Sequence, residues 1–347
     1  MHDKSINLIR ATAVVLAYNQ SDYISESIHS VLNQDFEGLE VILSDDGSTD
    51  DTFKIMSDIA NSYNGPHIIK LNKNINNLGF ISHLNKIFTL ASGEFIFYNP
   101  GDDISFPGRF KKLWAEYERT NALLVHSDVI KISDTGDEIG IWSRQSILEN
   151  LTLESAARST ALCIGATCGW HRDIFDKFGK IVEADTYDDL IFYFRAMLAG
   201  NRIGYVAEPL MYYRIGIGMT NTPAKTHAER EAHFKKNSLV RLATMKQRLR
   251  DCELYNSKIH HIKRYLNFEI KIYKGLLLAH NNSSYFSAIK NFSPTIFLGY
   301  VTGKRDIKGA YQWPLALARL LQELNFFKIA QKIYRKFFGV NLPKDRN

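Results

Sequence analysis

Phe95-Ile-Phe-Tyr-Asn-Pro-Gly-Asp-Asp-Ile-Ser-Phe-Pro-Gly-Arg109 is the stretch on which the prediction of the fold depends. The apolar residues from Phe95 to Tyr98 predict a buried strand, and Pro100-Gly101 ends it sharply. Two adjacent carboxylates, Asp102 and Asp103, therefore come directly after the carboxyl end of this strand.

Two interpretations of the adjacent carboxylates remain open. Neighbouring carboxylates repel each other unless a cation lies close by, and Mg²⁺ or Mn²⁺ prefers carboxylates, waters and phosphate oxygens, which a sugar diphosphate would supply. The alternative is a turn before a helix that Pro107 opens, where Asp is favoured by the positive end of the helix dipole. Taken alone, the stretch does not decide between them.

Composition indicates a globular protein with one large α/β domain and an appendage. The chain has 347 residues, of which 45% are hydrophobic and 23% charged. Three cysteines, Cys163, Cys168 and Cys252, give no disulfide framework and favour a reducing compartment. A zinc site at Cys163, Cys168 and His171 would lack a fourth ligand at suitable spacing. With no signal-peptide pattern and no run near the roughly 20 apolar residues of a membrane span, we expect a cytoplasmic location.

The charge is distributed unevenly along the chain. Residues 225–347 hold 24 Lys and Arg against 8 Asp and Glu, whereas residues 1–224 hold 19 against 29. The two parts thus carry about +16 and −10 by this count, and the change follows a small polar stretch at 220–224. We predict a first domain over residues 1–224 and a basic, mainly helical region over residues 225–347.

Apolar strands alternate with helical patterns along the first hundred residues. The predicted strands are Thr12–Tyr18, Leu39–Leu43, His67–Leu71 and Phe95–Tyr98. Alternation at this spacing predicts a mainly parallel central sheet flanked by helices, with all strand carboxyl ends on one rim, where ligands bind. Polar groups follow all four strands: Tyr18-Asn19, Asp45-Asp46, Asn77 with Gly79, and Asp102-Asp103.

A set of ordered motifs makes the interpretation specific. They are Val14-Val-Leu-Ala-Tyr-Asn19, Ser30-Val-Leu-Asn-Gln34, Asp45-Asp-Gly-Ser-Thr-Asp50, Asn77-Leu-Gly79 through Asn85, Ala91-Ser-Gly-Glu94, Gly101-Asp-Asp103 with Pro107 and Arg109, Gly165-Ala-Thr167, His171-Arg172, Phe178-Gly179, Asp188-Asp-Leu190 with Arg195, and Tyr212-Tyr-Arg214. Together they resemble the family 2 glycosyltransferases of bacterial polysaccharide and O-antigen type. The resemblance implies an inverting enzyme of the GT-A fold, with a Rossmann-like nucleotide-binding half, that uses a nucleoside-diphosphate sugar, with UDP as the expected nucleotide.

The resemblance also implies roles for particular residues. On the donor side, Tyr18 stacks on the nucleotide base and Asp46 meets its polar edge, Arg214 meets phosphate, and Asn19, Asn77, Gly79 and Asn85 line the site. Asp103 and Asp102 hold Mg²⁺ or Mn²⁺, with Asp102 also near the ribose. Asp189 is the general base that removes the proton of the acceptor hydroxyl. Trp170 and Asp188 lie on the acceptor side.

The sequence departs from the family pattern at two positions. Pro100 stands where the first Asp of the metal motif is common, and Gly216 stands where relatives often carry a His after the Arg. Both departures keep open an alternative of a different class, a catalytically silent nucleotide-sugar-binding scaffold in a glycan-assembly complex. The expected acceptor of an active enzyme is a saccharide or a lipid-linked saccharide.

The basic region predicts helices with apolar faces. The last of them places Leu317, Leu321, Leu324, Phe337 and Phe338 on an apolar face, among Lys328, Lys332, Arg335 and Lys336. A basic amphipathic helix is typical of peripheral binding to an anionic membrane surface, here the inner face of the plasma membrane; the alternative is a helix packed on the catalytic domain or a second subunit of a homo-oligomer. Nucleic acid is not an expected partner, because no binding motif is present and the first 224 residues are acidic.

Overall fold

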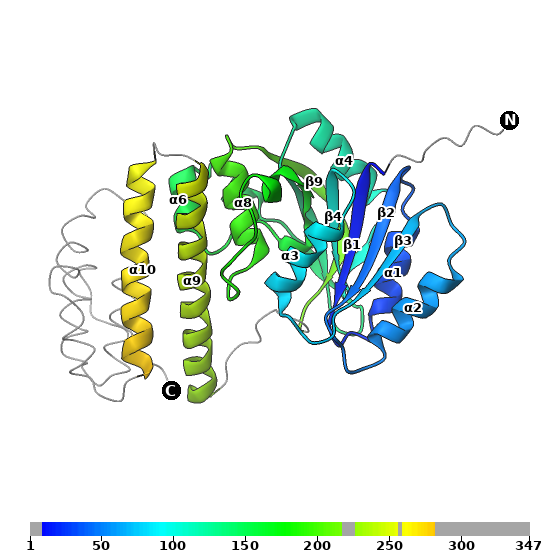
Figure 1. Ribbon diagram of the computed structural model, residues 1–347, viewed down its shortest axis with the longest axis horizontal. Coiled ribbons are helices and arrows are strands. Elements are labelled where there is room, and N and C mark those ends of the chain that lie inside the picture. Colours follow the sequence, from blue (N-terminus) through cyan, green and yellow to red (C-terminus); the bar gives the residue numbers. More distant parts are fainter. Residues whose placement is uncertain (1–8, 217–225, 256–258, 282–347) are drawn as a thin grey trace. The chain divides into compact units, whose positions relative to one another are not determined.

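Four parallel strands near the start of the chain form one half of a sheet (Figure 1). The computed structural model describes residues 9–216, 226–255 and 259–281. The strands β1 (Ala11–Ala17), β2 (Leu39–Asp45), β3 (Ile68–Lys73) and β4 (Phe95–Pro100) lie in the order β3-β2-β1-β4. All four predicted strands are confirmed, and their carboxyl ends meet at one rim.

Helices connect these strands and cover both faces of the sheet. They are α1 (Ile24–Leu32), α2 (Thr52–Ser62) and α3 (Phe80–Leu90). Alternate residues of β1 point to opposite faces, so Ala13 and Val15 pack with α1 and α2, whereas Val14 and Leu16 pack with α3. Burial on both faces explains why β1 is a continuous apolar run rather than an alternating one.

The second half of the sheet is mixed. Beyond β4 the order continues through β8 (Gly169–His171), β6 (Leu124–Ile132), β9 (Ile203–Arg214) and β5 (Ile104–Ser105), and β7 (Glu138–Trp142) pairs with β6. β6 and β9 are parallel, whereas β4–β8, β6–β8, β6–β7 and β5–β9 are antiparallel. The α/β fold is confirmed, with parallel pairing concentrated in the first half, where right-handed βαβ connections require it.

The remaining helices follow the order of the chain. They are α4 (Arg109–Thr120), α5 (Gln145–Leu148), α6 (Leu153–Arg158), the short 3₁₀ turn η1 (Gly165–Thr167), α7 (Asp173–Asp176), α8 (Asp188–Leu198), α9 (His227–Tyr255) and α10 (His260–Asn281). α8 is buried along almost its whole length and belongs to the core on the α3 face of the sheet.

Helix α9 lies beyond the predicted boundary at residue 224 but contacts α8 directly. Residues Met1–His280 form one compact unit. α9 and α10 give the helical character that the sequence predicts for the start of the basic region. The apolar and basic segment from Leu317 to Phe338 lies outside the described residues.

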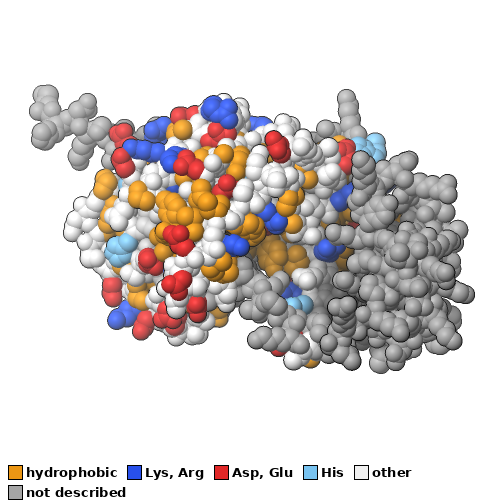
Figure 2. All heavy atoms as spheres, turned by 180° about the vertical axis from the view of Figure 1, so that it is seen from behind, with side chains coloured by type: hydrophobic (Ala, Val, Ile, Leu, Met, Phe, Trp, Pro, Cys, Tyr) orange, Lys and Arg blue, Asp and Glu red, His pale blue; other side chains and the backbone are white. Residues whose placement is uncertain are grey.

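Charged side chains are distributed unevenly over one face of the molecule. In the face shown in Figure 2, acidic side chains gather toward the lower left, whereas acidic and basic side chains are mixed toward the top. Exposed hydrophobic side chains lie between them. The acidic balance of residues 1–224 is therefore not spread evenly over the surface.

Candidate functional site

The rim where β1 and β2 end carries the first group of predicted residues. Tyr18 follows β1 and is 44% exposed, so its ring is accessible for stacking. Asn19 adopts a left-handed backbone conformation with φ of 52°, which Asn tolerates better than most residues. The Asn19 Oδ1 accepts a hydrogen bond from the Thr49 N–H at 2.9 Å, and the Asn19 N–H donates to Ser48 Oγ at 2.9 Å. Asn19 thus ties the loop after β1 to the loop after β2 and fixes the turn that presents Tyr18.

Asp46 organises the loop that follows β3. Its Oδ1 accepts hydrogen bonds from Asn74 Nδ2 at 2.7 Å and from the Leu78 N–H at 3.0 Å, and its Oδ2 accepts from the Gly79 N–H at 3.0 Å. The side chain is nearly fully buried. A carboxylate offers about four acceptor positions, so three protein donors leave about one for a ligand.

Asn77 and Gly79 form the turn that Asp46 holds. The Asn77 Oδ1 accepts a second hydrogen bond from the Gly79 N–H at 2.8 Å. Gly79 has φ of 80°, in the left-handed region that favours glycine, and α3 begins at the next residue. The structure therefore brings Asp46, Asn77 and Gly79 together at the rim, as the sequence predicts.

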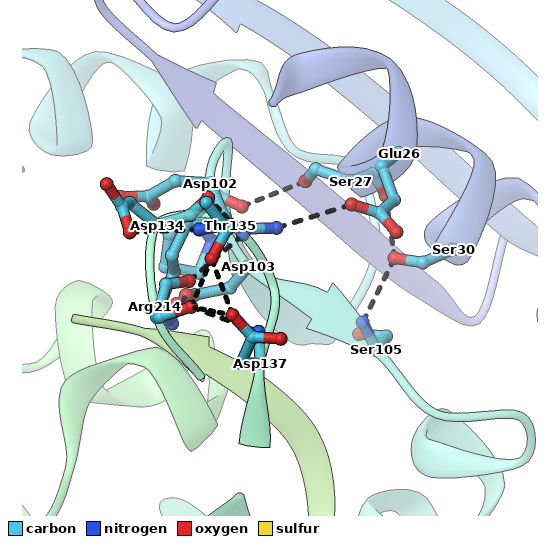
Figure 3. Close-up of polar contacts among 12 residues, drawn as sticks. Glu26, Ser27, Ser30, Asp102, Asp103, Ser105, Asp134, Thr135, Asp137 and Arg214 are labelled. Carbon is cyan, nitrogen blue, oxygen red and sulfur yellow. Dashed lines mark hydrogen bonds and ion pairs between the residues drawn. The ribbon is translucent and has the colours of Figure 1, made fainter. Parts of the chain in front are cut away.

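Asp102 and Asp103 follow β4 and are both buried. The Asp103 Oδ1 accepts a hydrogen bond from the backbone N–H of Arg214 at 2.8 Å, so the end of β9 orients this carboxylate (Figure 3). Burial and the neighbouring charge of Asp102 raise the pKa of Asp103 well above its usual range. The close approach of β1 requires Gly101, because a Cβ there would lie 2.8 Å from the Cβ of Ala17.

Arg214 connects the acidic pair to two other segments, the loop of residues 133–134 and the start of α1. Its Nε donates to the Asp102 carbonyl at 3.1 Å, and its Nη1 donates to the carbonyls of Ser133 and Asp134 at 3.2 and 2.9 Å. Its Nη2 contacts Glu26 Oε2 at 3.3 Å, and the guanidinium lies 4.7 Å from the ring centre of Tyr23. These contacts with protein groups make Arg214 a positioning residue for Asp102 and Asp103; the contact with phosphate stays a prediction.

The donor set at this rim fits a hard divalent cation bound together with a diphosphate. Among the described residues, no group of three or more His, Cys, Asp or Glu side chains is arranged as a complete metal site. The Asp103 Oδ2, however, is buried and has no hydrogen-bond partner within the described part of the chain. Mg²⁺ is typically bound by one or two carboxylates plus phosphate oxygens and waters, which is the number of ligands that Asp102 and Asp103 offer.

The second acidic pair begins helix α8. The Asp189 Oδ1 accepts a hydrogen bond from the Leu190 N–H at 2.7 Å, and the residue is partly exposed. Burial of the carboxyl raises the pKa of Asp189 to about 6, although the Leu190 N–H and the guanidinium groups of Arg248 and Arg144 oppose the shift. A carboxylate with a pKa near neutrality is suited to accept a proton at physiological pH.

Asp188 differs from its neighbour in its surroundings. Its side chain is buried, and its Oδ2 has no hydrogen-bond partner in the segments that the structure describes. Burial and the charge of Asp189 raise the pKa of Asp188 to about 8. Asp188 is therefore the more shielded acid of the pair, and Asp189 is the one that a substrate can reach.

The charges of both acidic pairs act on two tyrosines. Burial, and the charges of Asp103, Asp102 and Asp189, raise the pKa of Tyr213. Burial and the charges of Asp188, Asp102 and Asp103 likewise raise the pKa of Tyr98. Residues more than 80 positions apart in the chain thus act electrostatically on the same two hydroxyl groups.

Trp170 does not lie where the sequence interpretation puts it. The side chain is fully buried, with ring centres 5.3 Å from Tyr98 and 5.1 Å from Phe192. A fully buried ring cannot stack on an acceptor sugar, so the assignment of Trp170 to the acceptor side is corrected. Trp142, at the end of β7, is only partly buried and lies against Tyr213, with ring centres 5.8 Å apart.

The side-chain amide of Asn85 forms hydrogen bonds with the protein backbone. Its Nδ2 donates to the Ile181 carbonyl at 2.8 Å, and its Oδ1 accepts from the Ile181 N–H at 3.0 Å. Both functions of the side chain are thereby engaged by the segment that leads to Asp188. The structure places Asn85 as a support of that segment, and a direct contact with the donor stays a prediction.

Two residues near the acids do not follow from motif reasoning: the charges of Arg144 and Arg248 act on Asp189. Arg248 is fully buried in α9 and donates to the carbonyls of Leu190 and Ser159, at 2.9 and 2.8 Å. A fully buried Arg on a helix of basic composition gives no sequence signal, because its neighbours in the chain are solvated cations.

The comparisons with known proteins agree with this geometry. Residues 12–179 match the family model described as Glycosyl transferase family 2. An uncharacterized glycosyltransferase of Haemophilus influenzae is 35% identical over 121 residues, which are 35% of this chain and 36% of that protein. The chain thus spans about a third of the length of this curated relative.

Solved structures show the same fold. TarS of S. aureus, crystallised in complex with UDP-GlcNAc, aligns with a TM-score of 0.53 and 18% identity over 94% of this chain and 86% of that one. The mannosyltransferase PcManGT of Pyrobaculum calidifontis, in complex with GDP-Man and Mn²⁺, aligns with a TM-score of 0.51 and 16% identity over 94% and 87% of the two chains. At such low identity these likenesses establish the GT-A type of fold.

One further observation concerns membranes. Within residues 9–216, 226–255 and 259–281, no helix is both long enough and apolar enough to cross a bilayer.

The family match concerns one part of the chain. Residues 12–179 match the family 2 glycosyltransferase model, and the fold around them is of the GT-A type: this part of the chain is a family 2 glycosyltransferase domain.

Proposed function

We propose that the chain is an inverting glycosyltransferase that moves a sugar from a nucleoside-diphosphate sugar, with UDP as the expected nucleotide, to a hydroxyl of a saccharide or lipid-linked saccharide. The observation that carries the proposal is that the turn η1 lies between the second acidic pair and β4, the strand that Asp102 and Asp103 follow. A Cβ on Gly165 of η1 would lie 3.4 Å from Asp188 Oδ1 and from Asp189 Cβ, and Arg109 Nη2 donates to the carbonyls of both Ala166 and Tyr98. A donor diphosphate at the first pair would bring its anomeric carbon toward the second.

The nucleotide would bind at the ends of β1 and β2. The half-exposed ring of Tyr18 offers an apolar face for the base, and the remaining acceptor position of Asp46 suits a ring N–H. Asn19, Asn77 and Gly79 hold the two loops in place. The nucleotide base would thus have one stacking contact, with Tyr18, and one polar contact, with Asp46. The hydrogen bonds of Asn19 and Asn77 already hold the loops around these two residues in place within the protein.

Asp103 and Asp102 would hold Mg²⁺ or Mn²⁺ with the diphosphate. Such an ion neutralises the charge that develops on the leaving nucleoside diphosphate. The protein's own contribution is to orient the Asp103 carboxylate through the Arg214 N–H and to keep its Oδ2 without a competing protein donor in the described residues. Pro100 replaces a third acidic ligand, so we expect weak affinity for the metal.

Asp189 would accept the proton of the acceptor hydroxyl. Its Oδ1 is held by the Leu190 N–H, which leaves Oδ2 for the proton. Attack by the hydroxyl oxygen forms the new glycosidic bond as the bond to the diphosphate breaks, and a single displacement of this kind inverts the anomeric configuration. Burial of Asp188 keeps the other acid of the pair away from solvent.

A silent nucleotide-sugar-binding scaffold is the second candidate. Pro100, Gly216 and the engagement of Arg214 by protein groups favour it. The retained pair Asp103 and Asp189 favours catalysis. A scaffold would bind the donor without consuming it, so turnover separates the two candidates.

We propose that the enzyme acts in bacterial glycan assembly, in the cytoplasm and at the inner face of the plasma membrane. The support is the basic balance of residues 225–347, which suits an anionic surface. A second copy of the chain is the other partner that the apolar faces of this region would suit.

The test of the proposal begins with a screen of nucleotide sugars by thermal shift in the presence of Mn²⁺, followed by turnover of the donor that binds. Asp189→Asn keeps the shape of the side chain but cannot take up the proton, so transfer should fall about 10²- to 10⁴-fold while donor affinity stays unchanged. Asp188→Asn is the matched control. A damaging Asp188→Asn with a near-neutral Asp189→Asn would show that the base is the other acid.

A further inference from the structure

A surface cavity of about 400 Å³ lies beside the second acidic pair. One wall is the segment of residues 184–187, which leads into α8, and the opposite wall is the first half of α9. Phe80, the first residue of α3, completes the lining. All of these residues belong to the same compact unit, Met1–His280.

The cavity adjoins the groups that the proposed chemistry uses. Tyr187, which lines it, directly precedes Asp188, and the charge of Asp189 adds to burial in raising the pKa of Tyr187. Phe80 lies 6.3 Å from Tyr98 between ring centres, and the charges of both acidic pairs act on Tyr98. A molecule in the cavity would therefore be close to the base.

The lining combines apolar and cationic groups. Phe80, Tyr187 and Leu239 supply apolar and aromatic surface, and the exposed side chains of Lys235 and Lys236 supply positive charge. Asp185 is the acid in the lining. Aromatic rings pack on the faces of sugars or on hydrocarbon, and lysine ammonium groups bind phosphate as point charges.

We propose that this cavity binds the acceptor and selects one that carries a phosphate near its sugar, with Lys235 and Lys236 as the residues that recognise the phosphate. The inference rests on the proposed function, because it assigns the cavity to the acceptor of that reaction. The donor side has its own place for a diphosphate at Asp102 and Asp103, which do not line the cavity, whereas both lysines lie on α9 and do line it. The phosphate belongs either to a lipid phosphate or to the saccharide itself.

Binding of two probes to the full chain tests the proposal. Dodecyl phosphate below its micelle concentration represents a lipid phosphate, and glucose 1-phosphate represents a phosphate on a sugar. Titration calorimetry with EDTA present removes metal-dependent binding at the donor side. We expect at least one probe to bind, and dodecyl glucoside and glucose, which lack the phosphate, to bind more weakly.

The decisive variant is Lys235→Gln/Lys236→Gln, which removes two exposed positive charges. Its affinity for the phosphate probe should fall about tenfold, as expected for two exposed charge contacts. The matched control is Lys271→Gln/Lys274→Gln, which removes two exposed charges from α10 that do not line the cavity. The control should bind as the wild type does.

Each outcome decides for or against a phosphate-binding role of the cavity. Loss of binding in the cavity variant alone supports this role, and the probe that binds more tightly tells which source of phosphate the cavity prefers. Equal binding by wild type and the cavity variant, equal losses in both variants, or equal binding of phosphate and uncharged probes would overturn it. Donor hydrolysis by the wild type, measured in parallel, tests the proposed function separately. A wild type that binds phosphate in the cavity but consumes no nucleotide sugar would refute the proposed function and leave the phosphate site standing.

Discussion

Arg195 and Asp251 form a fully buried, bidentate ion pair that joins α8 to α9. The Arg195 Nε and Nη2 donate to the two carboxylate oxygens of Asp251, each at 3.0 Å, and both side chains are fully buried. The Arg195 Nη1 donates to the Gly179 carbonyl at 2.9 Å, and Gln247 Nε2 donates to Asp251 Oδ1 at 2.9 Å. A helix of the basic region thus provides the carboxylate that pairs with Arg195, a residue of the motif that begins with Asp188.

Breaking this pair should destabilise the fold. Asp251→Ala leaves the Arg195 charge buried without its carboxylate, and loss of one partner of a buried pair costs about 3–5 kcal/mol. Chemical denaturation should show a lower midpoint with a similar slope. Asp35→Asn is a matched control, because it breaks the exposed pair with Lys111, which is worth at most about 1 kcal/mol. Equal stability losses in the two variants would contradict this account.

Truncation should show that α9 is part of the same folding unit as the sheet. A chain that ends at residue 224 lacks Asp251 and exposes the buried face of α8, so we expect it to lose its cooperative unfolding transition. A chain that ends at residue 280 keeps the compact unit Met1–His280 and should unfold cooperatively. Circular dichroism melts of the two truncations make the comparison. A stable, cooperative 1–224 fragment would place the boundary where the charge pattern predicts it.

Removal of the Asp103 charge should separate metal binding from folding. Asp103→Asn can keep the hydrogen bond from the Arg214 N–H but loses the buried negative charge. Because that charge is buried beside Asp102, the variant should be at least as stable as wild type in the absence of metal. It should lose the thermal shift that Mn²⁺ and a nucleotide sugar produce together. Wild-type turnover by this variant would remove Asp103 from the metal site.

The pH dependence of turnover should follow the ionisation of Asp189. Its pKa is raised to about 6, and a general base must be deprotonated, so kcat/KM should rise as pH increases through about 6 and then level off. Arg144 lowers this pKa, so Arg144→Gln should move the rise to higher pH. A profile that is flat from pH 5 to 8, with no shift in Arg144→Gln, would exclude Asp189 as the base.

Binding to anionic vesicles should depend on ionic strength. Four basic residues, Lys328, Lys332, Arg335 and Lys336, would contribute about 1 kcal/mol each at an anionic surface. Co-sedimentation should therefore fall steeply between 0.1 M and 1 M salt, as the Debye length shrinks from about 10 Å to about 3 Å. Replacing all four residues by Gln should lower co-sedimentation with anionic vesicles, as high salt does. Equal binding to neutral and anionic vesicles, or none to either, would favour packing of this segment on protein.

The sequence by itself determined the parallel half of the sheet and the residues of its rim. Strand and helix periods are local, and parallel connections place all strand ends on one side, so Tyr18, Asp46 and Asp103 could be predicted to meet. Only the tertiary structure decided which side chains are buried or already engaged. Trp170 is enclosed by Tyr98 and Phe192, and Arg214 is engaged by carbonyls from other segments. The partner of Arg195, Asp251, lies on a helix more than 50 residues later in the chain. A buried charged side chain needs an opposite charge close to it in space, and packing can bring that charge from any distance along the chain.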